Sequence, residues 1–207
     1  MIPDLSHPET ILLKPENLRE TIDLEKVFNR PKPVKFEVDL GCGKGRFLIA
    51  RALSHKETCF LGIDRRQMRV LKVERAARRM KLKNIRLLCA ENFVAVENYI
   101  PAESVSVYYV FFPDPWPKRR HHRRRLFDAD FLNAIQRTLR ANGKIHITTD
   151  HLDYFAIIRN ILAADRRFAE SEPFVPAENE RTNFELVFMD LNKPIGRCSF
   201  MKTSPKN

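Results

Sequence analysis

Short apolar runs alternate with helix-like segments from Phe36 onward, and this alternation limits the fold more than any other feature of the chain. The runs short enough to be strands are FEVDL, CFLGI, IRLLCA, SVYYVFF and KIHITT. Between them lie segments with apolar residues at helical spacing, of which Leu126 to Leu139 is the clearest. Short strands that alternate with helices predict a mostly parallel sheet with helices on both faces.

The regions outside this rhythm predict how the chain is divided. The first thirty or so residues are polar and proline-dotted, with one possible short helix around Pro15 to Phe28, and NRPKPVK then resembles a linker. Asn142-Gly143 ends the predicted helix over Leu126 to Leu139. Further along, the last forty residues break the alternation and hold two more candidate strands, RFAES and IGRCSF. We therefore expect an N-terminal extension and linker over residues 1–34 and one α/β domain over residues 35–207.

Composition narrows the class of protein. Lys and Arg outnumber Asp and Glu by 37 to 26 in 207 residues, which gives a formal charge of +11 and favours a polyanionic partner. We expect no membrane span and no secretory signal. The four scattered cysteines have no CxxC pair and predict reduced thiols in a cytoplasmic protein. We expect no metal site, because no His, Cys and acid cluster has metal-ligand spacing.

A glycine turn follows the first strand and precedes a helix. Gly41, Gly43 and Gly45 lie in VDLGCGKG, where glycine lets the backbone approach a ligand closely. The spacing is not the G-x-G-x-x-G of dinucleotide binders, and Asp39 stands two places before the first glycine. A carboxylate there would repel a pyrophosphate but suits a ligand with an ammonium and a sulfonium. A tight turn without a ligand is the alternative.

Two more strands end in polar residues. Asp64 ends the second strand, where it either accepts hydrogen bonds from ribose hydroxyls or caps the next helix. Glu91 or Asn92 follows the third strand, where an adenine amine could be read. Because ligands of open α/β sheets bind at the carboxyl edge, these residues and Asp39 predict one shared site.

The most specific stretch follows the fourth strand and reads FFPDPWPKRRHHRRR. Three prolines restrict the loop that holds Asp114 and Trp116, the only tryptophan. Trp116 either stacks against a base or braces the loop. The basic run after it predicts phosphate contacts through Arg119, Arg120, Arg123, Arg124 and Arg125. A solvated charge run or a localisation signal is the alternative reading.

Together these residues resemble the class I S-adenosylmethionine-dependent methyltransferases, and FFPDPWPKRRHHRRRL with the later RTNFE resembles the bacterial tRNA (guanine-N7-)-methyltransferase family. The resemblance covers nearly everything from Phe36 to Lys202. It implies a Rossmann-like domain with a mostly parallel seven-stranded sheet and an antiparallel strand near the C-terminus. It also implies S-adenosylmethionine as cofactor and methylation of guanine N7 at position 46, in the variable loop of tRNA.

The resemblance also implies roles for residues. Asp114 is the catalytic candidate and lies near the cofactor. The cofactor-binding candidates are Asp39, Gly41, Gly43, Gly45, Asp64, Glu91, Asn92 and Asp114. The substrate-binding candidates are Lys118, Asp150, Thr182, Asn183, Phe184 and Glu185. Two other readings stay open: an adenine amino-group methyltransferase of RNA or DNA, and a non-catalytic RNA-binding protein on the same fold. We expect tRNA as partner and no second protein subunit.

Overall fold

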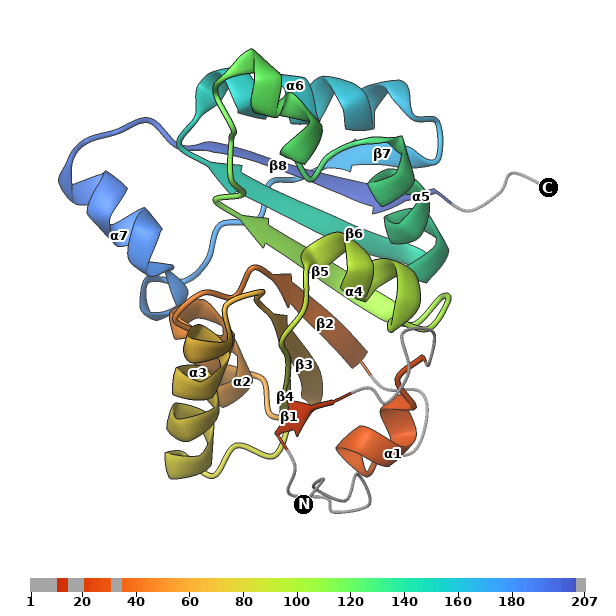
Figure 1. Ribbon diagram of the computed structural model, residues 1–207, viewed down its shortest axis with the longest axis vertical. Helices are drawn as coiled ribbons and strands as arrows, with labels where there is room; N and C mark the ends of the chain where they lie inside the picture. Colours follow the sequence, from red (N-terminus) through yellow and green to blue (C-terminus); the bar gives the residue numbers. More distant parts are fainter. Residues whose placement is uncertain (1–10, 15–20, 31–34, 204–207) are drawn as a thin grey trace.

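An eight-stranded sheet forms the centre of the molecule in the computed structural model, which describes residues 11–14, 21–30 and 35–203 (Figure 1). The strands are β1 (Leu12–Leu13), β2 (Lys35–Leu40), β3 (Thr58–Ile63), β4 (Ile85–Leu88), β5 (Val105–Phe111), β6 (Leu139–Thr149), β7 (Phe168–Ser171) and β8 (Gly196–Lys202). The α-helices are α1 (Leu24–Phe28), α2 (Arg46–Ser54), α3 (Gln67–Arg79), α4 (Asn92–Asn98), α5 (Ala129–Thr138), α6 (Leu152–Ala164) and α7 (Asn183–Asp190). Two 3₁₀ helices, η1 (Arg119–Arg124) and η2 (Glu178–Glu180), lie in the loops.

The strand order is β1-β4-β3-β2-β5-β6-β8-β7, and neighbours pair in parallel except for the two pairings of β8. The order reverses between β2 and β5, so the chain crosses from one half of the sheet to the other there. This arrangement confirms the predicted parallel sheet with an antiparallel strand near the C-terminus. The two-residue β1 is an additional edge strand, which lies within the predicted N-terminal extension.

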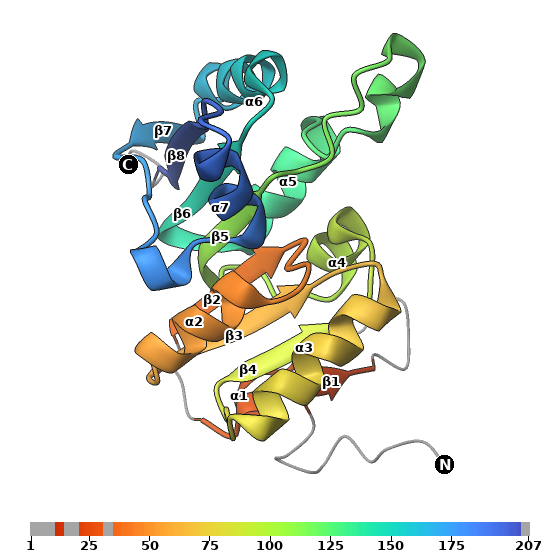
Figure 2. The same cartoon turned by 90° about the vertical axis from the view of Figure 1, so that its left-hand side faces the viewer.

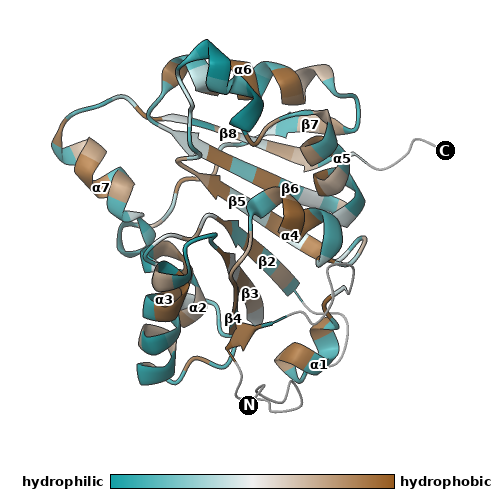
Figure 3. Cartoon of the chain, viewed as in Figure 1, coloured by the Kyte–Doolittle hydropathy of each residue, from teal (hydrophilic) through white to brown (hydrophobic). Residues whose placement is uncertain are grey.

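Alternating residues of the strands bury their side chains on opposite faces of the sheet. In β5, Tyr108 and Val110 join the core under α1, α4, α5 and α6, whereas Tyr109 and Phe111 face the other way. A second core lies under α2 and α3. Figure 3 shows the strands brown along much of their length, as expected for a sheet that is covered on both faces.

The N-terminal region packs onto the domain at two points. β1 pairs with β4, and the Ile22 amide donates to the Tyr99 carbonyl at 2.7 Å. Leu24 and Phe28 of α1 are buried in the core. The helix predicted around residues 15–28 is therefore present at its C-terminal end, while residues 1–10, 15–20 and 31–34, including most of the predicted linker, lie outside the described residues.

The predicted helix boundaries differ most before β6. Asp128 caps α5 by accepting from the Phe131 amide at 2.9 Å, and Leu139 is already extended, so the helix is shorter at both ends than its apolar spacing predicts. Asn142-Gly143 does not end this helix, which stops at Thr138; the pair lies in a bulge of β6, where the pairing with β5 passes from Leu139↔Val105 to Lys144↔Val107. Asn142 has a φ of 59° in this bulge.

The described residues show the state of the cysteines and the lengths of the helices. The four cysteines are free; Cys42, Cys59 and Cys198 are buried and Cys89 is exposed. In the described part of the chain, no helix is long and apolar enough to cross a membrane.

Candidate active site

Backbone hydrogen bonds attach the glycine turn to the carboxyl end of β3. The amides of Gly41 and Cys42 both donate to the Ile63 carbonyl, at 2.8 and 2.9 Å. Gly41 has a φ of 79° and Gly45 a φ of 74°, conformations that side chains with a Cβ rarely adopt. A Cβ on Gly45 would also lie 2.6 Å from a methyl of Val73. The turn therefore needs glycine both for its backbone angles and for the packing of α2 on α3.

Asp64 lies at the end of β3 with its carboxylate almost fully buried. It accepts from the amides of Gly43 at 3.1 Å and Arg66 at 2.8 Å, and the Arg69 guanidinium lies 3.4 Å away. The side chain therefore links the glycine turn to the start of α3. Asp64 therefore accepts from the residue that directly precedes α3, whereas its predicted contact with ribose hydroxyls stays a prediction.

Asp39 is buried near the end of β2 and is electrostatically coupled to Asp64. Burial, which disfavours the charged form, raises the pKa of Asp39 to about 7, and the negative charge of Asp64 adds to this effect. A carboxyl group held in this way gains most from a ligand that brings positive charge to it. The two acids therefore form a site suited to a cationic group.

Arg65 joins the ends of separate strands. Its guanidinium lies 3.5 Å from the Glu91 carboxylate after β4 and 3.7 Å from the Asp114 carboxylate after β5. Asn92 approaches the glycine turn, since its Nδ2 would lie 3.7 Å from a Cβ on Gly41. The structure thus brings the acids after β4 and β5 together at the edge that also holds the glycine turn. Sequence reasoning missed Arg65, although it directly follows Asp64.

Strained backbone and stacked side chains shape the proline-rich loop. Phe112 and Trp116 have positive φ values of 53° and 42°. The Trp116 ring lies at 5.0 Å from the Arg124 guanidinium and edge-on to His121 at 5.8 Å. Arg125 donates to the Pro115 carbonyl at 2.9 Å and stacks over Tyr154 of α6. These contacts favour the bracing role of Trp116 over base stacking, and they involve Arg124 and Arg125 in holding the loop.

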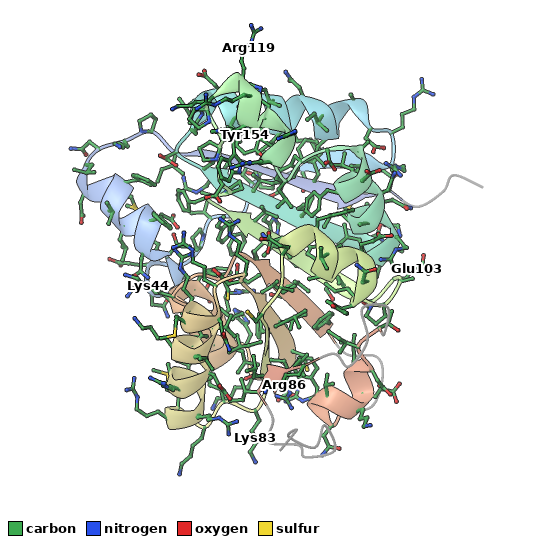
Figure 4. All side chains as sticks on the ribbon, in the orientation of Figure 1. Lys44, Lys83, Arg86, Glu103, Arg119 and Tyr154 are labelled. Atoms are coloured by element: carbon green, nitrogen blue, oxygen red, sulfur yellow. The ribbon has the colours of Figure 1, made fainter. Side chains whose placement is uncertain are left out.

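The basic run forms η1, whose three-residue repeat divides its side chains among three directions. His121 and Arg124 share the direction of Trp116, as their ring contacts show. Arg120 and Arg123 share a second direction and are exposed, as are Arg119 and the preceding Lys118. Figure 4 shows Arg119 pointing away from the body of the molecule.

The TNFE segment lies beside this loop. Phe184 of α7 is 56% exposed and its ring lies 5.8 Å from that of Phe112. Thr182 caps α7 by accepting from the Glu185 amide at 3.0 Å, and the buried Glu185 carboxylate pairs with Arg197 at 2.6 Å. Thr182 and Glu185 therefore fix α7 in place, while Phe184 and the exposed Asn183 face outward.

Asp150 follows β6 and is half-buried. The structure therefore places it at the same edge of the parallel strands as Asp39 and Asp64. Within the described part of the chain, no hydrogen bond or ion pair joins Asp150 to Asp114 or to α7.

A buried ion cluster anchors the segment that leads into α7. Arg51 of α2 lies 3.2 Å from Glu37 and 3.4 Å from Glu180 of η2, and the Tyr109 hydroxyl donates to Glu37 at 2.8 Å. Arg46 also donates to the Arg181 carbonyl at 2.9 Å. No motif marks these residues in the sequence, because the partners lie between 14 and 135 positions apart and meet only in the folded chain. Among the described residues, no group of His, Cys, Asp and Glu could hold a metal ion.

Comparisons with known proteins agree with this architecture. Residues 33–197 match a family model described as a putative methyltransferase. A tRNA (guanine-N(7)-)-methyltransferase of Nitrosomonas europaea is 31% identical over 188 residues, covering 89% of this chain and 83% of the relative. One from Mycoplasma genitalium is 35% identical over 175 residues, covering 80% and 83%.

Solved structures share the fold at low sequence identity. A 30S ribosomal A1408 methyltransferase from an uncultured bacterium superposes with a TM-score of 0.60 at 18% identity, covering 87% of this chain and 93% of that one. An rRNA methylase from Streptococcus thermophilus gives 0.55 at 14% identity, covering 83% and 88%. The class I methyltransferase fold predicted from the sequence is thereby confirmed.

Proposed function

The chain belongs to the tRNA (guanine-N(7)-)-methyltransferase family, and we propose that its site at the carboxyl edge of the sheet methylates N7 of guanine 46, in the variable loop of tRNA. The observation that carries this proposal is the double contact of Arg65 with Glu91 and Asp114. It joins the cofactor-binding half of the sheet to the proline-rich loop that marks the family.

The residues of the first three parallel strand ends fit S-adenosylmethionine. The cofactor supplies an electrophilic methyl group on a sulfonium sulfur. The Asp39 and Asp64 pair suits its positive charges, because burial and the negative charge of Asp64 raise the pKa of Asp39 to about 7 and a cationic ligand would favour the ionised form. The glycine turn lets the backbone approach closely, Asp64 would hold ribose hydroxyls, and Glu91 or Asn92 would read the adenine amine.

Asp114 is the proposed catalytic residue. Guanine N7 carries a lone pair and no proton, so it would take the methyl group without a general base, and the electron pair of the broken carbon–sulfur bond would stay on the departing thioether. The purine gains positive charge as the bond to the methyl carbon forms, and a nearby carboxylate stabilises this charge. Alignment of the reacting atoms would lower the activation barrier further, by up to about 7–11 kcal/mol in favourable intramolecular models. The prolines and the Arg125 contact hold Asp114 in place for this role.

Substrate binding is proposed for the surfaces around Asp114. Lys118, Arg119, Arg120 and Arg123 are exposed and would bind phosphates of tRNA. On the other side of the loop, Phe184 and Asn183 would contact the nucleotides near the target, with Asp150 after β6. All these residues come from one chain, so we propose that no partner subunit is required. We also propose that the enzyme works in the cytoplasm. None of them precedes residue 35, where we place the start of the catalytic domain.

Methyl transfer to tRNA tests the proposal directly. The protein is incubated with methyl-labelled S-adenosylmethionine and an unmodified tRNA transcript, which is then digested to nucleosides. Label in 7-methylguanosine supports the proposal, whereas label in methyladenosine would indicate an adenine methyltransferase. A tRNA that is bound but not labelled would indicate a non-catalytic binding protein. A transcript in which guanine 46 is replaced by adenine should accept no label; equal labelling would place the target elsewhere.

A further inference from the structure

Two segments account for the whole net positive charge of the molecule. Residues 65–83 contain nine Lys and Arg and one Glu, a net charge of +8, and residues 118–125 contain six Lys and Arg and no acid, a net charge of +6. Together they carry +14, whereas the whole chain carries +11, so all other residues sum to −3. The basic character is therefore localised, and the larger share lies in a segment to which the proposed mechanism assigns only Arg65.

The outer face of α3 presents much of this charge. The helix buries Val70, Val73 and Ala77 against the sheet. On the opposite side, Lys72, Arg75 and Arg79 are exposed at helical spacing, and we call these three residues the α3 stripe. The neighbouring cations are engaged elsewhere: Arg69 pairs with Asp64, and Arg78 pairs with Glu74 at 3.0 Å.

This arrangement opposes helix stability. Lys72 and Arg75 are three residues apart and Arg75 and Arg79 are four apart, so each pair repels by about 0.2–0.5 kcal/mol. The first turn of α3 contains no acidic residue and its N-cap makes no side-chain bond. A face that served only to be solvated would be more stable with mixed charges. A bound polyanion would remove the repulsion, which is the reason to look for one.

The position of the α3 stripe suits a long polyanion. α3 begins three residues after Asp64 at the candidate site, and its thirteen residues carry it about 20 Å along the molecule. In Figure 2, α3 lies below the centre of the molecule and the segment between β5 and α5 projects above it, at the upper right. Figure 4 places Lys83, just beyond α3, and Arg119 of η1 at opposite ends of the long axis. A ligand that reaches both surfaces is far longer than one nucleotide.

We propose that the α3 stripe is a second phosphate-binding surface, which holds a helical arm of tRNA while the target guanine lies at the carboxyl edge and η1 binds the backbone on the other side. This inference rests on tRNA as the substrate. Three cations in a row on a rigid helix neutralise successive phosphates without reading sequence. The surface would therefore select for the shape of the whole tRNA and not for the target loop alone.

The test compares two variants with the same net charge. In the first, Lys72→Gln, Arg75→Gln and Arg79→Gln neutralise the α3 stripe. In the control, Lys26→Gln, Arg140→Gln and Arg166→Gln neutralise three exposed cations of α1, β6 and the turn after α6. Dissociation constants are measured over a salt series for a full-length tRNA transcript and for a short RNA that holds only the nucleotides around the target. Cofactor affinity and thermal unfolding show that each variant is folded.

For full-length tRNA, the stripe variant should bind more weakly, with a log–log salt slope shallower by about 2–3. The control variant should keep the wild-type slope, and the short RNA should bind both variants alike. An equal loss of tRNA affinity in the two variants would show an effect of net charge alone and would overturn the proposal. An equal loss of affinity for the two RNAs in the stripe variant, or an unchanged salt slope, would overturn it as well. Because affinity is the readout, a wild-type protein that binds tRNA through the stripe but forms no 7-methylguanosine would contradict only the proposed function.

Discussion

Asp39 shows, at the scale of a single residue, how binding chemistry opposes stability. Burial and the charge of Asp64 raise its pKa to about 7 from an ordinary value of 3.8. A folded-state pKa above the unfolded value favours folding at low pH, and this contribution is lost as the pH rises toward 7. The full cost above pH 7 has an upper limit of about 4 kcal/mol. The ionised form of Asp39, which binds a cation best, is therefore also the form that most lowers the stability of the folded protein.

Replacing Asp39 by Asn separates these two effects. Asn has no charge to bury, so the variant should be more stable than the wild type at pH 8, and the difference should shrink toward pH 4. The variant should also lose most of its affinity for S-adenosylmethionine. Denaturant unfolding at a series of pH values and calorimetric titration measure the two properties. A stability difference that does not change with pH, or unaltered cofactor affinity, would contradict this account of Asp39.

Arg65 should matter for catalysis much more than for stability. Its ion pairs with Glu91 and Asp114 join side chains that are about half or more exposed, and such pairs contribute at most about 1 kcal/mol. Arg65→Gln should therefore unfold within about 1 kcal/mol of the wild type but transfer methyl groups about 10- to 100-fold more slowly, because Asp114 loses its positioning partner. Arg78→Gln, which breaks an exposed pair far along α3, is the control and should leave the single-turnover rate unchanged. A wild-type rate in Arg65→Gln would show that the contact is incidental.

At the scale of elements, η1 combines two functions that its sequence does not separate. Its 3₁₀ repeat directs Arg124 toward Trp116 and leaves Arg119, Arg120 and Arg123 exposed. Arg125, at the end of η1, contacts Pro115 and Tyr154. The arginines of this basic run therefore divide into phosphate-binding candidates and residues that hold the proline-rich loop.

Two variants distinguish these roles. Neutralising Arg119, Arg120 and Arg123 should weaken tRNA binding and make the salt slope shallower by about 2–3, with the rate at saturating tRNA nearly unchanged. Arg125→Gln should instead lower that rate and change the slope little, since it loosens the loop that carries Asp114. Salt-dependent binding and single-turnover kinetics measure both. If the two variants behaved alike, η1 would not be divided in this way.

The elements that sequence predicts best are those whose signal is local. The five parallel strands, the glycine turn and the helices after them follow from apolar runs and spacing, and all are present. The start of α5 depends on the Asp128 cap, and its end depends on the pairing of Leu139 with Val105, which no local pattern reveals. β1 is too short to predict, because two residues form a strand only through the partner strand β4.

Some features of the candidate site could likewise be predicted from the sequence, and others could not. The acids at the strand ends could be predicted, since a parallel sheet brings its carboxyl ends together. The Arg65 bridge could not, because it depends on the direction of one flexible side chain. The Arg51–Glu180 pair joins residues 129 positions apart, and only the folded chain brings them together. The pairing of Glu185 with Arg197 holds α7 in place, and the TNFE motif gives no sign of this structural contact.

At the scale of the whole molecule, charge and fold are arranged around one edge. The two basic segments flank the site, whereas the remainder of the chain is slightly acidic. A polyanion would therefore be attracted to the side of the molecule on which the proposed cofactor-binding residues and Asp114 lie, and would be repelled weakly elsewhere. In the proposed mechanism, the parallel sheet positions the reacting groups and the two basic segments orient the tRNA.

The central claim is that methyl transfer takes place at Asp114, where the proline-rich loop meets the strand ends. The most direct test is the single-turnover rate of methyl transfer to tRNA by Asp114→Ala, measured together with its affinities for tRNA and S-adenosylmethionine. We predict a rate about 100- to 1,000-fold below wild type, with both affinities within about threefold. A near wild-type rate, or affinities that fall as far as the rate, would contradict the claim.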